Sequence, residues 1–119
     1  MSEESFEHEP RSLEISFGDV FEHTFESNTR TFVVLSVGED SWFEASAIVT
    51  LKNGKKGLFG GGTSGPEDVH KKTGERWSLD EIRVAFNNYA RENWGRDTSR
   101  EIVDLITEYS RKPSRVINY

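Results

Sequence analysis

The chain has 119 residues, of which 34% are hydrophobic and 30% charged, with a formal net charge of -6 and no cysteine. Leu, Ile, Val and Phe account for 29 of the 119 residues, which exceeds the roughly 20% below which disorder is expected. The lack of cysteine excludes disulfides, thiolate zinc sites and cysteine nucleophiles. No apolar run reaches the roughly 20 residues of a membrane span, and residues 1–5 lack the pattern of a secretory signal. We therefore expect a cytoplasmic protein that does not enter a membrane.

The two ends of the chain have no apolar periodicity. Residues 1–11 are polar and acidic, so we expect a disordered acidic tail. Residues 114–119 follow Pro113 and are expected to form a second, short tail. Between them, residues 12–113 have the length of one ordinary domain.

Antiparallel strands are predicted over about 13–60. Apolar and polar residues alternate over 13–17 and again over 42–51, which is the period of a half-buried strand. Residues 31–37 are almost all β-branched or apolar, as in a central strand covered on both faces. The second alternation puts one set of apolar residues on a single face of the sheet: Phe43, Ala45, Ala47, Val49 and Leu51.

A hairpin turn is predicted at Asn53 and Gly54, because this dipeptide suits a type I′ turn with positive φ at both positions. The return strand is expected to be short, and residues 60–77 are expected to be irregular. The segment from Gly60 to Gly65 reads Gly-Gly-Gly-Thr-Ser-Gly. Such a segment can present backbone N–H groups to an anion, but it lacks the Gly-Lys-Ser/Thr ending of a P-loop. We expect a flexible loop, with a partner-contacting loop or a nucleotide cradle as alternatives.

Two helices are predicted to follow. Ser78 and Glu81 have the spacing of a capping box, and apolar residues recur at helical spacing over 79–93. Gly95 supplies a stop signal. A second helix is expected over 98–111, with Thr98 and Glu101 again in capping-box register.

The order of these elements indicates the α+β class, because all strands precede all helices. We expect an antiparallel sheet of four to five strands followed by a C-terminal helical hairpin packed on the face that carries Phe43, Ala45 and Ala47. We expect Leu105 to lie in the shared core. A small closed β-barrel with two appended helices is the alternative.

Catalytic and metal-binding patterns are not found in the sequence. His8, His23 and His70 do not have the spacing of metal-ligand pairs. Glu22 and His23 are neighbours in a predicted strand, so their side chains should lie on opposite faces. The sequence has no Gly-x-Ser-x-Gly elbow. We therefore predict no catalytic residue, no metal and no cofactor, and do not expect an enzyme.

Charge is distributed unevenly along the chain. Residues 52–77 carry six basic and three acidic residues and are the only segment with a net positive charge. Such a segment can steer an acidic partner. Exposed aromatic residues near it would add contact area, since they are enriched at interfaces. The predicted partner-binding residues are Trp42, Lys52, Lys55, Lys56, Phe59, Lys71, Lys72 and Arg76.

These observations predict a non-enzymatic, acidic regulatory protein that docks on another macromolecule, most readily a protein. Inhibitors, antitoxins and regulators encoded on mobile elements are of this type. The first alternative is a nucleic-acid-binding module that uses residues 52–76, with Phe59 and Trp77 as stacking groups. The second is a small enzyme or ligand binder with its site at the Gly60 to Gly65 loop.

Overall fold

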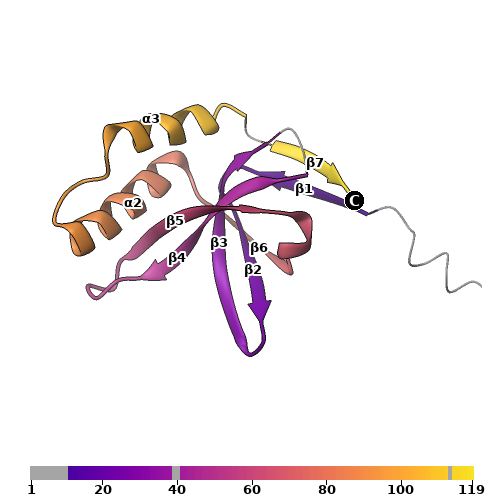
Figure 1. Ribbon diagram of the computed structural model, residues 1–119, viewed down its shortest axis with the longest axis horizontal. Coiled ribbons are helices and arrows are strands. Elements are labelled where there is room, and N and C mark those ends of the chain that lie inside the picture. Colours follow the sequence, from indigo (N-terminus) through magenta and orange to yellow (C-terminus); the bar gives the residue numbers. More distant parts are fainter. Residues whose placement is uncertain (1–10, 39–40, 113) are drawn as a thin grey trace, which may run out of the picture.

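The computed structural model describes residues 11–38, 41–112 and 114–119. It contains a five-stranded antiparallel sheet, a two-stranded sheet and two α-helices, so the predicted α+β class is confirmed (Figure 1). The elements are β1 (Ser12–Ser16), β2 (Asp19–Phe25), β3 (Asn28–Val37), β4 (Phe43–Thr50), β5 (Lys56–Ser64), the 3-10 turn η1 (Pro66–Asp68), β6 (Lys71–Arg76), α2 (Leu79–Trp94), α3 (Arg100–Tyr109) and β7 (Ser114–Asn118).

The main sheet has the strand order β5-β4-β3-β2-β6, and all its pairs are antiparallel. Four to five strands were expected, but β6 comes from a segment that was predicted to be irregular, and β1 lies in the second sheet. Strands β5 and β6 end the order and do not pair with each other in the described part of the chain. The main sheet is therefore open, and the closed-barrel alternative is not formed.

The segment from Gly60 to Gly65 is not the flexible loop that the sequence predicted. Residues 60–64 continue β5 and pair with β4, with Gly62 opposite Ala45 and Ser64 opposite Phe43. A β-bulge, with Gly60 at φ 68°, accommodates an extra residue at this point. Pairing with a neighbouring strand here outweighs the low strand propensity of glycine.

The hairpin between β4 and β5 forms at the predicted position with a different turn. Gly54 has φ 82°, but Asn53 does not have positive φ. The Gly54 N–H donates to the Leu51 carbonyl at 2.9 Å, and the Leu51 N–H donates to the Lys55 carbonyl at 2.8 Å. This pattern is a type I turn followed by a left-handed glycine rather than the type I′ turn.

The expected C-terminal tail is a strand. Residues of β7 pair with β1 in antiparallel register, with Ile117 opposite Leu13. Arg11 and Tyr119 extend the pairing through two backbone hydrogen bonds of 2.8 Å. Residues 1–10 of the predicted acidic tail lie outside the described residues. Sequence periodicity missed β7 because a five-residue strand with a single buried residue carries almost no pattern.

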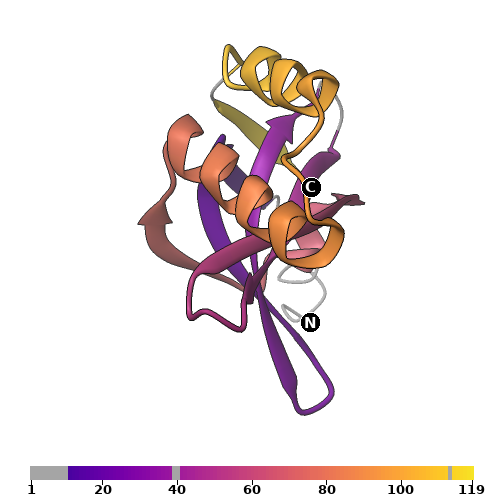
Figure 2. The same cartoon turned by 90° about the vertical axis from the view of Figure 1, so that its left-hand side faces the viewer.

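Both helices lie on one side of the main sheet (Figures 1 and 2). The capping box of Ser78 and Glu81 is present, and Gly95 ends α2 in the left-handed conformation at φ 66°. Helix α3 is capped by Ser99 instead of Thr98, and so begins later than predicted. Neither helix is long and apolar enough to cross a membrane.

The core consists of two clusters on opposite faces of the sheet. The first joins the helices to the sheet and contains Val20, Val33, Leu35, Leu58, Trp77, Ile82, Ala85 and Ile106. The second is covered by β1 and β7 and contains Ile15, Phe21, Val34, Val37, Phe43, Ala45 and Ile117.

The predicted position of the helices was therefore wrong. Phe43 and Ala45 belong to the cluster away from the helices, and Leu105 is exposed instead of buried. The alternation correctly placed Phe43 and Ala45 on one face of β4, because the extra residues at the register irregularities lie in β3 and β5. Alternation does not show which of the two faces the helices cover, and β1 and β7 cover this one.

Candidate functional site

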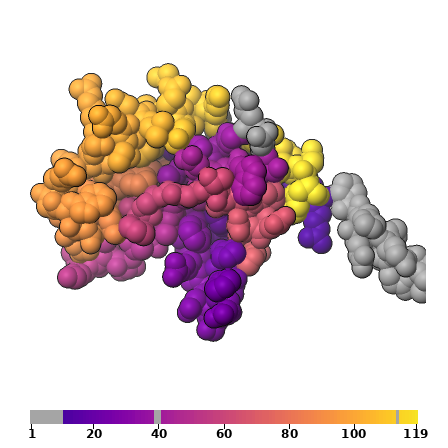
Figure 3. All heavy atoms as spheres, viewed as in Figure 1, coloured from indigo at the N-terminus to yellow at the C-terminus, as the bar shows by residue number. Residues whose placement is uncertain are grey.

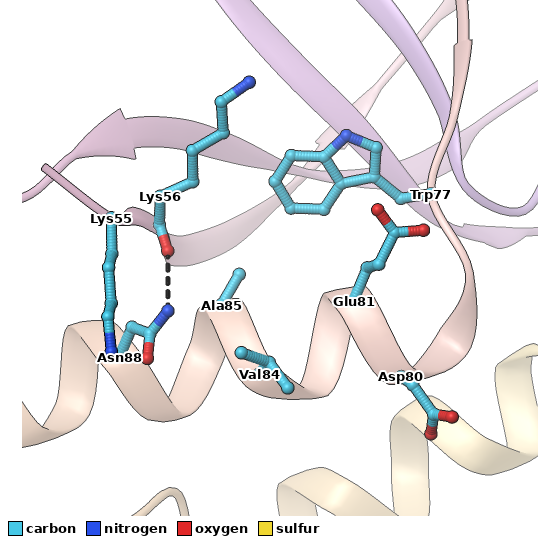
Figure 4. A pocket seen from close by; sticks show the side chains of 8 residues that line it. All are labelled: Lys55, Lys56, Trp77, Asp80, Glu81, Val84, Ala85 and Asn88. Atoms are coloured by element: carbon cyan, nitrogen blue, oxygen red, sulfur yellow. Dashed lines mark hydrogen bonds between the residues drawn. The ribbon is translucent and has the colours of Figure 1, made fainter.

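An open groove of about 500 Å³ lies between the N-terminal part of α2 and the start of β5 (Figure 4). Its walls come from the β4–β5 hairpin, from the residue that follows β6, and from one face of α2. The lining residues are Lys55, Lys56, Trp77, Asp80, Glu81, Val84, Ala85 and Asn88.

Trp77 forms the apolar end of this groove and is held by a close backbone contact. Its N–H donates to the Gly18 carbonyl at 2.8 Å. Gly18 has φ 86°, and a Cβ atom there would lie 2.1 Å from the Trp77 carbonyl oxygen. No other residue fits this position without displacing the backbone. The turn between β1 and β2 therefore fixes the indole beneath α2, where it is buried in the first core cluster.

Two hydrogen bonds attach the hairpin wall to α2. The Asn88 side-chain amide donates to the Lys56 carbonyl at 3.1 Å, as Figure 4 shows. The Lys52 backbone N–H donates to the Glu92 carboxylate at 2.9 Å. Because these bonds use backbone groups of the hairpin, the lysine ammonium groups are left at the rim of the groove. The Lys56 ammonium lies 5.9 Å from the Trp77 ring centroid, within reach of a cation–π contact.

The acidic residues at the other end of the groove are engaged in local interactions. The Ser78 N–H donates to the Glu81 carboxylate at 3.0 Å, and the Glu81 N–H donates to the Ser78 hydroxyl at 3.1 Å. Hydrogen bonds from the Ser78 backbone, then from its side chain, lower the pKa of Glu81. Asp80 forms an ion pair of 3.4 Å with Arg83. No carboxylate in the described residues forms an ion pair with Lys52, Lys55 or Lys56.

The predicted partner-binding residues do not form one surface. Lys55 and Lys56 line the groove, and Lys52 lies in the adjoining turn. Phe59 lies further along β5, with its ring centroid 5.1 Å from that of Tyr89 on α2. The Trp42 ring packs next to Gly65, at the end of β5.

The remaining predicted residues, Lys71, Lys72 and Arg76, lie on β6 at the opposite edge of the sheet. Lys72 and Arg76 form ion pairs of 3.2 and 3.1 Å with the buried carboxylate of Asp19. The same carboxylate accepts a hydrogen bond from the Ser16 N–H at 2.9 Å. Two of the three predicted basic residues therefore attach β6 to β2. Nothing local in the sequence indicates this pairing, because 57 positions separate Asp19 from Arg76.

A second, mostly apolar cavity of about 200 Å³ lies between α2, α3 and the sheet. Glu44 and Tyr109 are among its lining residues. Burial, then the negative charge of Glu44 and a hydrogen bond to it, raise the pKa of Tyr109. Thr98 contributes a buried hydroxyl without a hydrogen-bond partner in the described residues. The cavity is smaller than the roughly 300 Å³ at which ligand pockets begin.

Two histidines far apart in the sequence also meet. The His23 and His70 rings stack with centroids 4.4 Å apart. The Thr24 N–H donates to His70 Nδ1 at 2.9 Å, and His23 Nδ1 lies 3.0 Å from the Asp68 carbonyl. Both contacts attach the segment before β6 to β2. No group of three or more metal-ligating residues occurs in the part of the chain that the structure describes.

Comparison with known proteins adds no relative: no family model, no curated protein and no solved structure matches this chain.

Proposed function

We propose that this protein is a non-enzymatic binding protein that docks on another protein through the groove between the β4–β5 hairpin and α2. One observation carries the proposal: a groove with an apolar floor is bordered by lysines that have no ion-pair partner in the described residues. Apolar area supplies affinity, and surrounding charge supplies steering and specificity. A regulatory or inhibitory role by docking is the function that this arrangement supports best.

The form of the groove favours a macromolecular partner over a small substrate. Its floor includes Val84, whose side chain is 57% exposed although it is apolar. The carboxylates beside it are engaged in a helix cap and an ion pair. The glycine segment offers no loop cradle, because residues 60–64 form part of β5. A side chain from an acidic partner protein would bury Val84 and place its charge near Lys55 and Lys56.

A nucleic-acid partner is supported less well. Binding along a phosphate backbone needs several uncompensated cations on one surface. The cations of residues 52–76 are divided between the two edges of the sheet, and Lys72 and Arg76 both pair with the Asp19 carboxylate. That leaves Lys52, Lys55 and Lys56 as a small basic surface beside acidic residues of α2.

The test begins by isolating the partner with three baits: the wild-type protein, Val84→Glu and Lys71→Glu. A partner that uses the groove is retained by the wild type and lost from Val84→Glu, because the new carboxylate removes apolar surface from the floor and repels an acidic partner. Lys71→Glu on β6 is the matched control and should retain the partner. Equal retention by all three baits would contradict the proposal.

Kinetics with the purified partner then test the role of the lysines. Charge reversal at Lys52, Lys55 and Lys56 should slow association by about tenfold or more at low salt and by less at physiological salt. The fold should be unaffected, since these side chains lie around an exposed turn. A gel shift with duplex DNA and single-stranded RNA at two salt concentrations tests the other class of partner. Salt-sensitive retardation that the three substitutions abolish would favour nucleic acid instead.

A further inference from the structure

The two edges of the main sheet differ in their protection against strand pairing. The β6 edge has the sequence Lys-Lys-Thr-Gly-Glu-Arg, in which four of six residues are charged. Charges of this kind prevent another strand from pairing with an edge. The β5 edge carries no charged residue from Gly57 to Pro66. Charged residues thus protect the β6 edge against strand pairing, and the β5 edge lacks this protection.

The second half of β5 is also sterically open. Helix α2 reaches the start of the strand, where Asn88 bonds to the Lys56 carbonyl. Residues 60–63 are exposed, and a Cβ atom on Gly62 would meet no heavy atom within 4 Å. Figure 3 shows the segment near residue 60 crossing the visible face uncovered by the helices. Glycines within a strand often mark a place where another backbone approaches closely.

An exposed aromatic residue stands at each end of this open segment. Phe59 precedes it and is 53% exposed. Trp42 is 56% exposed, and its ring lies 3.5 Å from the Cβ position of Gly65, just after the segment. Exposed large aromatics beside an unpaired strand edge are features of a protein interface.

We propose that the open edge of β5 pairs antiparallel with β5 of a second copy of this chain, about a twofold axis at Gly62. In this register Gly60 pairs with Ser64 of the second copy, and Phe59 lies opposite Gly65 of that copy. The exposed Phe59 ring of each copy then meets the Trp42 ring of the other. This self-complementarity is required of a twofold interface. The two five-stranded sheets become one continuous sheet with both helix pairs on the same side.

The size and charge of the interface define its behaviour. Five paired residues and four aromatic rings make a small contact, so the dimer belongs to the weak class, with a dissociation constant in the micromolar range or above. Each copy carries a formal charge of -6. Added salt therefore strengthens the dimer by screening the repulsion between copies. The interface shares no residue with the proposed partner groove, so either proposal can fail without the other.

A cysteine trap tests the register directly, because the chain has no cysteine of its own. Residues facing each other across an antiparallel pair have Cα atoms about 4.5–5.5 Å apart, within the range of a disulfide. Gly62→Cys should form a covalent dimer on mild oxidation at micromolar concentration. Val84→Cys, an exposed thiol in the partner groove, should crosslink at least tenfold more slowly. Equal rates for the two variants would overturn the proposal.

Sedimentation of the uncrosslinked protein gives the second readout. The wild type should show a concentration-dependent approach to dimer that increases with salt. Gly62→Lys places two like charges at the axis and should raise the dissociation constant about tenfold or more. Gly62→Gln has a similar length without the charge and should weaken the dimer less. If the wild type remains monomeric at every concentration and salt level, the proposed pairing is refuted. The β5 edge then binds a foreign strand or no partner.

Discussion

Ile117 in β7 provides the most direct test of the fold, because the sequence predicts a tail at this position and the structure buries the Ile117 side chain in the core. Its side chain is only 3% exposed and packs in the cluster that contains Ile15, Phe21 and Val34. Its neighbour Val116 is 54% exposed on the same strand. The two residues share backbone pairing and differ in burial, so Ile117→Ala and Val116→Ala are a matched pair.

The expected loss follows from the carbon removed. Truncating Ile117 to Ala removes three carbon groups at about 0.8 kcal/mol each, or about 2.4 kcal/mol of transfer free energy. The cavity left beside Phe21 adds to this, giving a free energy of unfolding lower by about 3–4 kcal/mol. Val116→Ala should change it by no more than about 0.5 kcal/mol. Since the whole domain is stable by about 5–15 kcal/mol, the first substitution removes a large share.

Urea unfolding followed by tryptophan fluorescence measures both variants. With a slope of about 2 kcal/mol/M, Ile117→Ala should lower the midpoint by about 1.5–2 M. Far-ultraviolet circular dichroism before denaturation checks that the variant still folds. Equal midpoints for the two variants would show that β7 does not pack on the sheet, and the assignment of the second core cluster would fail.

Four further substitutions test other parts of the structure. Ile82→Ala should lower the free energy of unfolding by about 3 kcal/mol, and Leu105→Ala by less than about 1 kcal/mol because that side chain is exposed, as urea unfolding can measure. Asp19→Asn should cost about 2 kcal/mol in the same assay, a moderate loss because its two cation partners can return to solvent; a neutral result would show that these ion pairs do not attach β6. The pKa of Tyr109 should lie above that of an ordinary tyrosine in an ultraviolet titration, and Glu44→Gln should lower it only in part, because burial is the larger cause. Since the folded-state pKa of this phenol is raised, its stabilising contribution is complete below the unfolded-state pKa near 10 and is lost as the pH rises through the folded-state value; an unchanged alkaline unfolding curve for Glu44→Gln would contradict this coupling.

The candidate site was only partly predictable. Lys55 and Lys56 were identified from charge and from the turn beside them, and they do line a groove. Trp77 was predicted only as a stacking group for nucleic acid beside the basic hairpin, and Val84 was not predicted at all. The two line one groove only because α2 packs against β5. Lys72 and Arg76 were assigned to the same surface, yet their pairing with Asp19 places them at the other edge. Net charge along a sequence segment does not show which cations are already neutralised by distant residues.

By itself, the sequence determined the features that depend on neighbouring residues. The capping box of Ser78 and Glu81 acts over three positions, and Gly95 ends α2 by its own backbone freedom. Alternation predicted β1 and β4, a run of β-branched and apolar residues predicted β3, and the order of elements predicted the α+β class.

Only the tertiary structure decided which face each strand buries, whether residues 60–64 form a strand, and whether β7 pairs with β1. These outcomes depend on partners far away in the sequence, such as Ser12 opposite Asn118. The residues of a short segment do not show which distant strand will pair with it. A single bulge also changes which face of the sheet each following residue of that strand lies on. The short glycine-rich half of β5 and the five residues of β7 are strands because other strands supply their hydrogen bonds and cover their few apolar side chains.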